Sequence, residues 1–417
     1  MKNIEIIGGN RLSGELRIHG SKNAVLPILA GCVLNHGETI IRDCPDLSDV
    51  YSAFDILRTL GCIVEFRDNT AIIDAKNVNC YTIPDDLMRQ TRSSVMFLGA
   101  IISRCREARI SRPGGCDLGA RPIDIHIKAF RELGIDIEEA EAYIHCKARS
   151  TISGGKVTLD FPSVGATENV MLLTAKSNGT TVISNAAREP EIVDLQNFLN
   201  SMGANISGAG TSEITIRGAK SLHNAEYTVI PDRIVASTYM CAAAASGSEI
   251  TLTNIVPAHI APVISVLRNS GCEITLSENS LTLASDGKLI AVEGIETKPY
   301  PGFPTDAQAL VMATLATASG TTMFVENLFE SRFKHIAELA KMGAEITQFK
   351  QVAAVRGVER LHGADVSATD LRGGAALVIA ALGATGKTII GSTAHIDRGY
   401  ENLVKNLTLL GAAIKRT

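Results

Sequence analysis

The stretch from Gly179 to Ser207, GTTVISNAAREPEIVDLQNFLNSMGANIS, contains one complete structural phrase. A segment of alternating character is followed by a polar loop, an amphipathic helix, one glycine and a second alternating segment. The helix carries apolar residues at the 3-4-3 spacing of one buried stripe, at Ile192, Leu195, Leu199 and Met202. Gly203 then stands where the backbone needs a positive φ to end the helix. The phrase therefore predicts a strand, a helix and a return strand.

The same phrase occurs six times in the 417-residue chain, so the fold is built from an internal repeat. The glycines that end the six helices are 73, 69, 68, 72 and 68 residues apart, at Gly61, Gly134, Gly203, Gly271, Gly343 and Gly411. A second helical segment precedes each phrase and is small and apolar on all sides, as in TDAQALVMATLATASG at 305–320, which is typical of a buried helix. Six such units predict an α/β fold, with the helices either enclosed by strands or layered on sheets.

The N-terminal segment bears on how the last unit is completed. The final unit reaches residue 417 without its closing strands, whereas residues 1–20 hold two strand-like segments, NIEIIGG and GELRIHG, and no helix. We expect residues 1–20 to complete the final unit. A chain of this length exceeds one ordinary core, so we expect two domains, one of residues 21–229 and one of residues 1–20 with 230–417.

The composition excludes several classes of function. The chain is 45% hydrophobic and 20% charged, with a formal net charge of −4 and no run of Lys or Arg, which argues against a nucleic-acid partner. It shows neither the apolar core of a signal peptide nor the roughly 18 apolar residues of a membrane span, so we expect a cytoplasmic protein without a membrane partner. Nine scattered cysteines without a Cys-x-x-Cys motif indicate no disulfide framework and no metal site. We expect no cofactor, and the oligomeric state stays open.

The six units differ in charge at two places, and these are the candidate functional positions. The apolar helices begin at Asn23, Arg92, Gly165, Arg233, Asp306 and Arg372. The positions 13 residues before the six glycines are Ser48, Arg121, Pro190, Ala258, Glu330 and Arg398. Helix N-termini attract phosphate and carboxylate groups, so cations at these positions indicate an anionic ligand. The alternative for any one arginine is a solvated or capping role. His126 fits a core histidine on an apolar stripe, and Asp306 fits an acid in a first helical turn.

Cys116 stands apart from the other cysteines. The second phrase is four residues longer than the first, and the extra residues fall near RPGGCDLGAR at 112–121, so the thiol lies in an inserted polar loop. Arg112 and Arg121 are close to it in sequence, and cationic neighbours lower a thiol pKa from about 8.5 and make it reactive. Cys116 is therefore the predicted reactive cysteine, whereas most of the others fit small buried residues.

Eight segments spread over the whole chain resemble the enolpyruvyl transferases that act on UDP-N-acetylglucosamine: GSKNAVLPILA, RPGGCDLGARPIDIH, PSVGATEN, NAAREPEIVDL, FPTDAQA, FESRFKH, TDLRGGAAL and HIDRGYE. The resemblance implies a two-domain inside-out α/β barrel of six βαβαββ units, three per domain, with the active site in the cleft between the domains. It also implies transfer of the enolpyruvyl group of phosphoenolpyruvate to the 3-hydroxyl of UDP-N-acetylglucosamine with release of phosphate. This reaction is the first committed step of peptidoglycan synthesis.

The resemblance implies a role for each matching residue. The expected catalytic residues are Cys116, Asp306, Lys22 and Arg398. Among these, Cys116 would donate a proton and be the target of the epoxide fosfomycin, and Asp306 would face the sugar hydroxyl. The expected contacts of phosphoenolpyruvate are Lys22, Asn23, Arg121 and Arg398. The expected contacts of UDP-N-acetylglucosamine are Arg92, Arg121, Pro122, Ile123, Asp124, Ile125, Phe161, Pro162, Ser163, Val164, Gly165, Asp306 and Leu328. The expected supporting residues are Arg332, Asp370 and Arg372.

Two alternatives remain. A 5-enolpyruvylshikimate-3-phosphate synthase would share the repeats and the donor, but the Pro-Gly-Gly-Cys loop and the Arg-Pro-Ile-Asp segment argue against it. A catalytically idle regulatory paralogue is a rival of another class, against which Lys22, Cys116, Asp306 and Arg398 are all present. Phosphate release with each acceptor distinguishes these possibilities.

Overall fold

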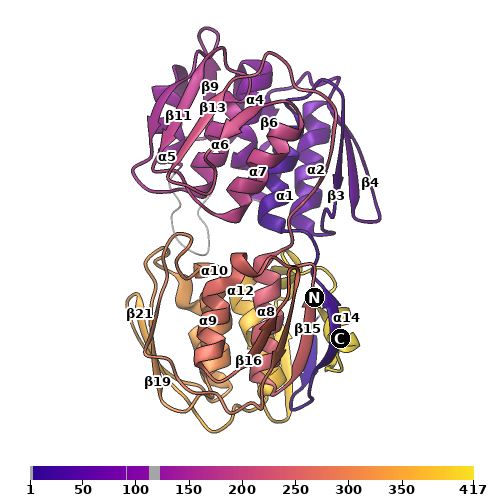
Figure 1. Ribbon diagram of the computed structural model, residues 1–417, viewed down its shortest axis with the longest axis vertical. Coiled ribbons are helices and arrows are strands. Elements are labelled where there is room, and N and C mark those ends of the chain that lie inside the picture. Colours follow the sequence, from indigo (N-terminus) through magenta and orange to yellow (C-terminus); the bar gives the residue numbers. More distant parts are fainter. Residues whose placement is uncertain (1–2, 91, 112–122) are drawn as a thin grey trace. The chain divides into compact units, whose positions relative to one another are not determined.

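The computed structural model describes residues 3–90, 92–111 and 123–417, which divide into two compact units (Figure 1). The N-terminal unit holds residues 20–111 and 123–230, and the C-terminal unit holds residues 3–19 and 231–417. Each unit has its own hydrophobic core. Within the described residues, no helix combines the length and the apolar character that a bilayer crossing requires.

The opening stretch of sequence lies in a βαβαββ motif that recurs in both units. Its elements are β10 (Gly155–Thr158), α6 (Val164–Thr174), β11 (Thr180–Ser184), α7 (Pro190–Ser201), β12 (Asn205–Ser207) and β13 (Glu213–Arg217). The helix α6 crosses over between the parallel strands β10 and β11, and β13 pairs antiparallel with both β11 and β12. The sheet order is therefore β10-β11-β13-β12. The strand, helix and return strand predicted for 179–207 are confirmed.

Two further motifs complete the N-terminal unit. The first consists of α1 (Lys22–Cys32), β3 (Glu38–Arg42), α2 (Ser48–Leu60), β4 (Ile63–Arg67) and β5 (Thr70–Asp74), and its edge strand is β14 (Ala225–Thr228). The second consists of β6 (Thr82–Ile83), α3 (Asp85–Gln90), the 3-10 helix η1 (Arg92–Met96), α4 (Phe97–Cys105), β7 (Glu107–Ser111), α5 (Asp124–Glu132), β8 (Ile135–Glu139) and β9 (Tyr143–Ala148).

The C-terminal unit contains the other three motifs. The fourth consists of β2 (Ser13–Arg17), α8 (Arg233–Ala245), β15 (Glu249–Thr253), η2 (Pro257–Ile260), α9 (Ala261–Asn269), β16 (Glu273–Leu276) and β17 (Ser280–Ala284). The fifth consists of β18 (Gly294–Glu296), α10 (Thr305–Leu315), β19 (Thr321–Val325), η3 (Arg332–His335), α11 (Ile336–Lys341), β20 (Glu345–Phe349) and β21 (Val352–Arg356). The sixth consists of β22 (Asp365–Ser367), α12 (Leu371–Gly383), β23 (Lys387–Gly391), α13 (Ala394–Asp397), α14 (Leu403–Leu409), β24 (Ala413–Arg416) and β1 (Ile4–Ile7).

The N-terminal segment supplies strands to two different sheets. The strand β1 lies between β23 and β24, so NIEIIGG completes the sixth motif as expected. The strand β2 instead pairs in parallel with β15 of the fourth motif, so the expectation that GELRIHG also completes the final unit was wrong. The chain turns between the two strands at Gly9, whose φ is +85°, a backbone conformation that glycine adopts without strain.

One helix of each motif lies inside its unit. In the N-terminal unit α1, α4 and α6 pack on one another, and in the C-terminal unit α8, α10 and α12 do the same, with strands around them (Figure 1). These helices have no polar face; in α12, for example, every residue from Arg372 to Leu382 is buried. Because such helices need cover on all sides, the enclosed arrangement is realised rather than the layered one.

The second helix of each motif ends as the sequence predicted. All six of the predicted glycines have positive φ, between +79° at Gly134 and +103° at Gly61. The apolar stripe of the opening stretch, from Ile192 to Met202, is fully buried. The periodicity and the glycine together therefore define where the outer helix lies and where the chain reverses.

Candidate active site

The helix starts hold the residues in which the repeats differ. Asn23, Gly165, Asp306 and Arg372 are each the second residue of an inner helix, and Arg92 and Arg233 are the first residues of η1 and α8. Backbone N–H groups without helical partners gather at these positions, and the helix dipole is positive there. The sequence register therefore identified the helix starts correctly.

In the C-terminal unit, Asp306 is held by two arginines. Its Oδ1 accepts hydrogen bonds from Arg332 Nη2 at 2.9 Å and from Arg372 Nε at 3.2 Å. The two arginine side chains are only 3% and 5% exposed, whereas that of Asp306 is 31% exposed. The cations are thus buried behind a carboxylate that solvent or a ligand can reach.

The charges of this cluster stabilise one another. Burial alone would raise the pKa of Asp306, but the positive charges of Arg372, Arg332 and Arg233 hold that pKa well below its usual range. Burial also opposes the charge of Arg372, yet Tyr400 and Asp306 raise the pKa of its guanidinium above the ordinary value. Asp306 is therefore an ionised hydrogen-bond acceptor throughout the physiological pH range.

Through Tyr400, Arg372 on α12 is also connected to α8. Its Nη1 donates to Tyr400 Oη at 3.3 Å, and this hydroxyl lies 2.9 Å from Thr238 Oγ1 on α8. Tyr400 was not among the candidate residues singled out from the sequence, so its hydroxyl was missed. The signal was available, since Val50 and Ile192 occupy the same place in other motifs and carry no polar group.

Asp370 and Asp232 cap the starts of two inner helices. Asp370 Oδ1 accepts from the backbone N–H groups of Arg372 and Gly373 at 2.9 and 3.0 Å, so it is the N-cap of α12. Asp232 caps α8 in the same way through Ile234 and Val235. Asp370 therefore holds the helix turn that presents Arg372 to Asp306.

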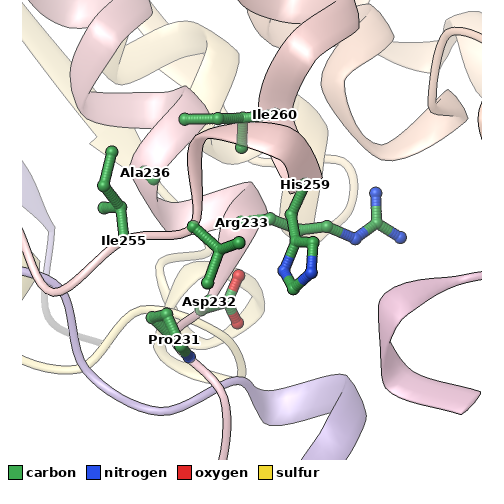
Figure 2. A pocket seen from close by; sticks show the side chains of 8 residues that line it. Pro231, Asp232, Arg233, Ala236, Ile255, His259 and Ile260 are labelled. Atoms are coloured by element: carbon green, nitrogen blue, oxygen red, sulfur yellow. The ribbon is translucent and has the colours of Figure 1, made fainter. Parts of the chain in front are cut away.

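A small hollow lies at the start of α8. Figure 2 shows Arg233 and His259 beside it, with Asp232 behind them and the apolar side chains of Ile255 and Ile260 around it. The Arg233 guanidinium lies 5.9 Å from the centre of the Tyr300 ring. Its charge also contributes to the low pKa of Asp306. Arg233 thus belongs to the electrostatic surroundings of Asp306, a role that the sequence did not assign to it.

In the N-terminal unit, Lys22 is the first residue of α1 and forms a buried ion pair. Its Nζ lies 2.8 Å from Asp49 Oδ2 in the first turn of α2, and the two side chains are 11% and 3% exposed. Ser21 caps α1 by accepting from Ala24 N at 3.3 Å. Asn23, next to Lys22, is half-buried. The sequence missed Asp49, because an acid in a first helical turn is usually explained by the helix dipole alone.

The helices α5 and α6, at whose starts lie two of the segments expected to bind UDP-N-acetylglucosamine, contact each other. Asn169 Nδ2 on α6 donates to His126 Nδ1 on α5 at 3.0 Å. A Cβ added to Gly165 would lie only 3.1 Å from His126 Cε1, so a side chain there would displace the ring. Burial lowers the pKa of His126 to about 4, and the prediction of a satisfied core histidine is confirmed. Phe161 is 46% exposed and lies before α6.

The remaining expected residues are placed only in part. Arg398 is half-buried and follows α13, and Leu328 is half-buried after β19. Ile123 and Ile125 are half-buried at the start of α5, whereas Asp124 is exposed. The expected residues that lie outside the described residues are Cys116, Arg121 and Pro122. In the parts of the chain that the structure describes, no three His, Cys, Asp or Glu side chains gather as metal ligands would.

Comparison with known proteins shows the family. A model of EPSP synthase (3-phosphoshikimate 1-carboxyvinyltransferase) matches residues 6–407. UDP-N-acetylglucosamine 1-carboxyvinyltransferase 2 of Caldanaerobacter subterraneus subsp. tengcongensis is 51% identical over 100% of both chains, and the UDP-N-acetylglucosamine 1-carboxyvinyltransferase of Finegoldia magna is 43% identical over 100% of this chain and 99% of its own.

Solved structures agree with this assignment. The enolpyruvyl transferase NikO from Streptomyces tendae superposes with a TM-score of 0.89 at 27% identity, covering 100% of this chain and 99% of its own. EPSP synthase from Acinetobacter baumannii superposes with a TM-score of 0.77 over 100% of both chains, and at 17% identity this shows the fold alone. The chain therefore belongs to the UDP-N-acetylglucosamine 1-carboxyvinyltransferases, within the EPSP synthase family of enolpyruvyl transferases.

Proposed function

We propose that this protein transfers the enolpyruvyl group of phosphoenolpyruvate to the 3-hydroxyl of UDP-N-acetylglucosamine and releases phosphate, in the first committed step of peptidoglycan synthesis. The observation that carries this proposal is the 51% identity, over the full length of both chains, to a relative named for that activity. The ionised Asp306, held by two buried arginines at helix starts, supplies a hydrogen-bond acceptor that suits an acceptor hydroxyl.

Binding of phosphoenolpyruvate is assigned to four residues: Lys22, Asn23, Arg121 and Arg398. The donor carries a carboxylate and a phosphate, which pair well with cationic side chains and with the N–H groups of a helix start. Lys22 stands at the start of α1 and is already held by Asp49. The ion pair orients the ammonium group before the donor arrives, so less side-chain freedom is lost on binding.

The reaction proceeds by addition and elimination. The Cys116 thiol gives its proton to the methylene carbon of phosphoenolpyruvate, which creates a cationic, oxocarbenium-like centre at the adjacent carbon. The sugar 3-hydroxyl oxygen forms a bond to that carbon while its proton passes to Asp306, and a tetrahedral ketal results. The carbon–oxygen bond to phosphate then breaks, a methyl proton leaves to a base, and the double bond forms again.

The low pKa of Asp306 decides how this residue acts. A carboxylate with a strongly lowered pKa is a weak base, so it cannot remove a proton from a free alcohol. It can orient the hydroxyl by accepting a hydrogen bond and take the proton late, once attack on the cationic carbon has made the hydroxyl acidic. Arg332 and Arg372 keep the carboxylate oriented throughout, and Asp370 supports Arg372 as its helix cap.

The nucleotide sugar is assigned to residues from both units. Residues 121–125 and 161–165 are proposed to hold the uridine and the diphosphate. Arg92 is proposed to lie near the reacting groups, and Leu328 and Asp306 to contact the acetylglucosamine. The packing of His126 on α5 against Gly165 and Asn169 on α6 supports this, because the two segments lie at the starts of these contacting helices. An exposed aromatic ring such as Phe161 also suits an apolar contact with a base. We propose that residues 21–229 and residues 1–20 with 230–417 are the two functional domains and that the reaction requires both.

Product analysis tests the proposal. Incubation with phosphoenolpyruvate and UDP-N-acetylglucosamine is expected to release phosphate and to yield the enolpyruvyl ether of the nucleotide sugar, identified by its mass. No new nucleotide product would contradict the proposal and favour an idle paralogue. A 5-enolpyruvylshikimate-3-phosphate synthase is not favoured, since solved enzymes of that name are only 17% identical to this chain.

A further inference from the structure

We infer that Glu326 is a positioning residue for the acceptor side of the active site, because its buried carboxylate joins the first turn of α10 to the segment that carries Leu328. The first turn of α10 presents Asp306, and Leu328 is proposed to contact the acetylglucosamine. The inference therefore rests on the proposed function and adds to it a residue that touches neither substrate.

The contacts of Glu326 connect these two segments directly. Its side chain follows β19 and is only 1% exposed. The two carboxylate oxygens accept from the Thr305 hydroxyl at 3.1 and 3.0 Å. Oε1 also accepts from the backbone N–H groups of Leu328 at 3.0 Å and Phe329 at 3.1 Å. One carboxylate thus holds both the residue before Asp306 and the backbone at Leu328.

Thr305 is held from a second direction as well. Arg332 Nη2 donates to the Thr305 carbonyl at 3.1 Å and to Asp306 Oδ1 at 2.9 Å. Glu326 therefore fixes the side chain of Thr305, while Arg332 fixes its backbone and the neighbouring carboxylate. Because α10 has no side-chain N-cap bond, its first turn is held by these contacts together with the hydrogen bond from Arg372 to Asp306.

Comparison of the motifs shows that a charge at this place is exceptional. The structurally equivalent residues each donate a backbone N–H at 2.9 to 3.0 Å to the turn between the last two strands of their motif, and they are Cys44, Ala186, Ile255 and Glu326. The first three are apolar and 0%, 1% and 3% exposed. In their motifs a residue with positive φ precedes them, namely Asp43, Asn185 and Asn254. The fifth motif lacks this extra residue, so Glu326 directly follows β19.

The energetics explain why this departure points to function. A buried carboxylate loses its hydration, and hydrogen bonds must compensate for that loss. An apolar residue fills the equivalent place in three other motifs without this cost, so packing alone does not require a carboxylate. What the carboxylate adds is a rigid connection between two segments, and small displacements of catalytic groups lower rates strongly.

The test uses Thr305→Val, which removes the hydroxyl that Glu326 binds, together with Thr305→Ser, which keeps it. We expect Thr305→Val and Glu326→Gln to raise the KM for UDP-N-acetylglucosamine about tenfold and to lower kcat about tenfold. The KM for phosphoenolpyruvate should stay within about twofold, because the donor is assigned to other residues. Thr305→Ser should restore near wild-type values for both substrates.

Matched controls separate positioning from a general loss of structure. Thr314→Val makes the same change on the same helix, at a buried hydroxyl that donates to Leu310 O at 2.9 Å, and should leave both KM values unchanged. Glu338→Gln changes a carboxylate of α11 that accepts from Ser367 N at 2.8 Å and serves as the control for Glu326→Gln. The melting temperature of every variant is measured alongside, and Thr305→Val keeps the test valid even if Glu326→Gln fails to fold.

Each outcome decides the inference. A higher acceptor KM and a lower kcat with an unchanged donor KM, all restored by serine, support it. Equal changes in both KM values, or a Thr305→Val variant that behaves like Thr314→Val, overturn the inference. If the wild type is active in the same assay, the proposed function still stands. A wild type that releases no phosphate with UDP-N-acetylglucosamine overturns the proposed function, and the inference with it.

Discussion

Asp306 shows how one side chain acquires its chemistry from its neighbours. An acid in a first helical turn is favoured by the helix dipole, and this explanation requires no function. The structure adds two buried arginines that bond to the same carboxylate oxygen while the side chain stays partly exposed. Two desolvated cations directed at one partly exposed carboxylate are more than a helix start needs, which is why the residue is assigned to the acceptor hydroxyl.

Asp306→Asn tests this assignment. The amide oxygen can still accept from Arg332 and Arg372, so binding of UDP-N-acetylglucosamine should change by less than about threefold, while kcat should fall roughly 10²- to 10⁴-fold because the amide takes no proton. Steady-state phosphate release and calorimetric binding measure the two effects. Asp286→Asn, an exposed acid that accepts from Lys288 N at 2.8 Å, is the control. Wild-type turnover in Asp306→Asn would refute the assignment.

The cysteines allow a second test of the roles assigned to single residues. Burial raises the thiol pKa of Cys62, Cys146 and Cys241 to about 12 and that of Cys272 to about 11, so these side chains remain unreactive thiols at neutral pH. We expect the epoxide fosfomycin to alkylate Cys116 alone, through thiolate attack that opens the ring. Peptide mass spectrometry after limited exposure locates the adduct.

Variants of the same cysteine separate its acid role from its nucleophilic role. Cys116→Asp should keep activity, most clearly at lower pH, and resist the epoxide, because a carboxyl group can also donate a proton. Cys116→Ser should be less active, since an alcohol is a far weaker acid. Labelling spread evenly over several cysteines, or an Asp variant inert at every pH, would contradict the role given to Cys116.

Among the elements, the outer helices and their terminal glycines set the shape of each motif. Every one of these glycines has positive φ, but the space around them differs. At Gly134 an added Cβ would meet nothing within 4 Å, whereas at Gly61 it would come within 2.6 Å of the Asn77 carbonyl oxygen. The two positions therefore share the backbone requirement and differ in steric hindrance.

This pair gives a stability prediction. Gly134→Ala should lower the free energy of unfolding by about 1 to 2 kcal/mol, the cost of a left-handed backbone for alanine. Gly61→Ala should cost clearly more, because the carbonyl must move as well. Denaturant unfolding of the two variants provides the comparison, and equal losses would show that the packing around Gly61 contributes nothing.

The contact between α5 and α6 gives a prediction about pH. Burial lowers the pKa of His126 from the ordinary 6.5 to about 4, so between these values the unfolded chain binds a proton that the folded chain does not. As far as His126 is concerned, the free energy of unfolding is therefore highest above pH 6.5. It falls as the pH drops toward 4, by up to about 3 kcal/mol. An NMR titration should place the His126 pKa near 4 in the folded protein, and a value near 6.5 would contradict the burial of its ring.

Sequence patterns predicted the elements better than the contacts between them. Periodicity and the terminal glycines located the outer helices, and charge differences between units marked the starts of the inner ones. Asp49 and Glu326 were missed because their partners, Lys22 and Thr305, are more than 20 residues away in the sequence. The pairing of β2 was also missed, since one short strand pattern does not specify which of several similar sheets it joins.

On the scale of the whole molecule, each unit is completed by a strand from a distant part of the chain. The first motif of the N-terminal unit takes β14 from that unit's end, and the C-terminal unit takes β1 and β2 from the start of the chain. The catalytic assignments are also divided, since Lys22 belongs to the N-terminal unit and Asp306 to the C-terminal unit. We propose that these residues serve one reaction with a nucleotide sugar as the acceptor.

The most direct test is the rate of phosphate release from phosphoenolpyruvate with two acceptors, UDP-N-acetylglucosamine and shikimate 3-phosphate. We expect kcat/KM for UDP-N-acetylglucosamine to exceed that for shikimate 3-phosphate by at least about 10³-fold, because the polar groups of a site that binds uridine and diphosphate stay unpaired with the smaller acceptor. A preference for shikimate 3-phosphate, or no phosphate release with either acceptor, would contradict this expectation.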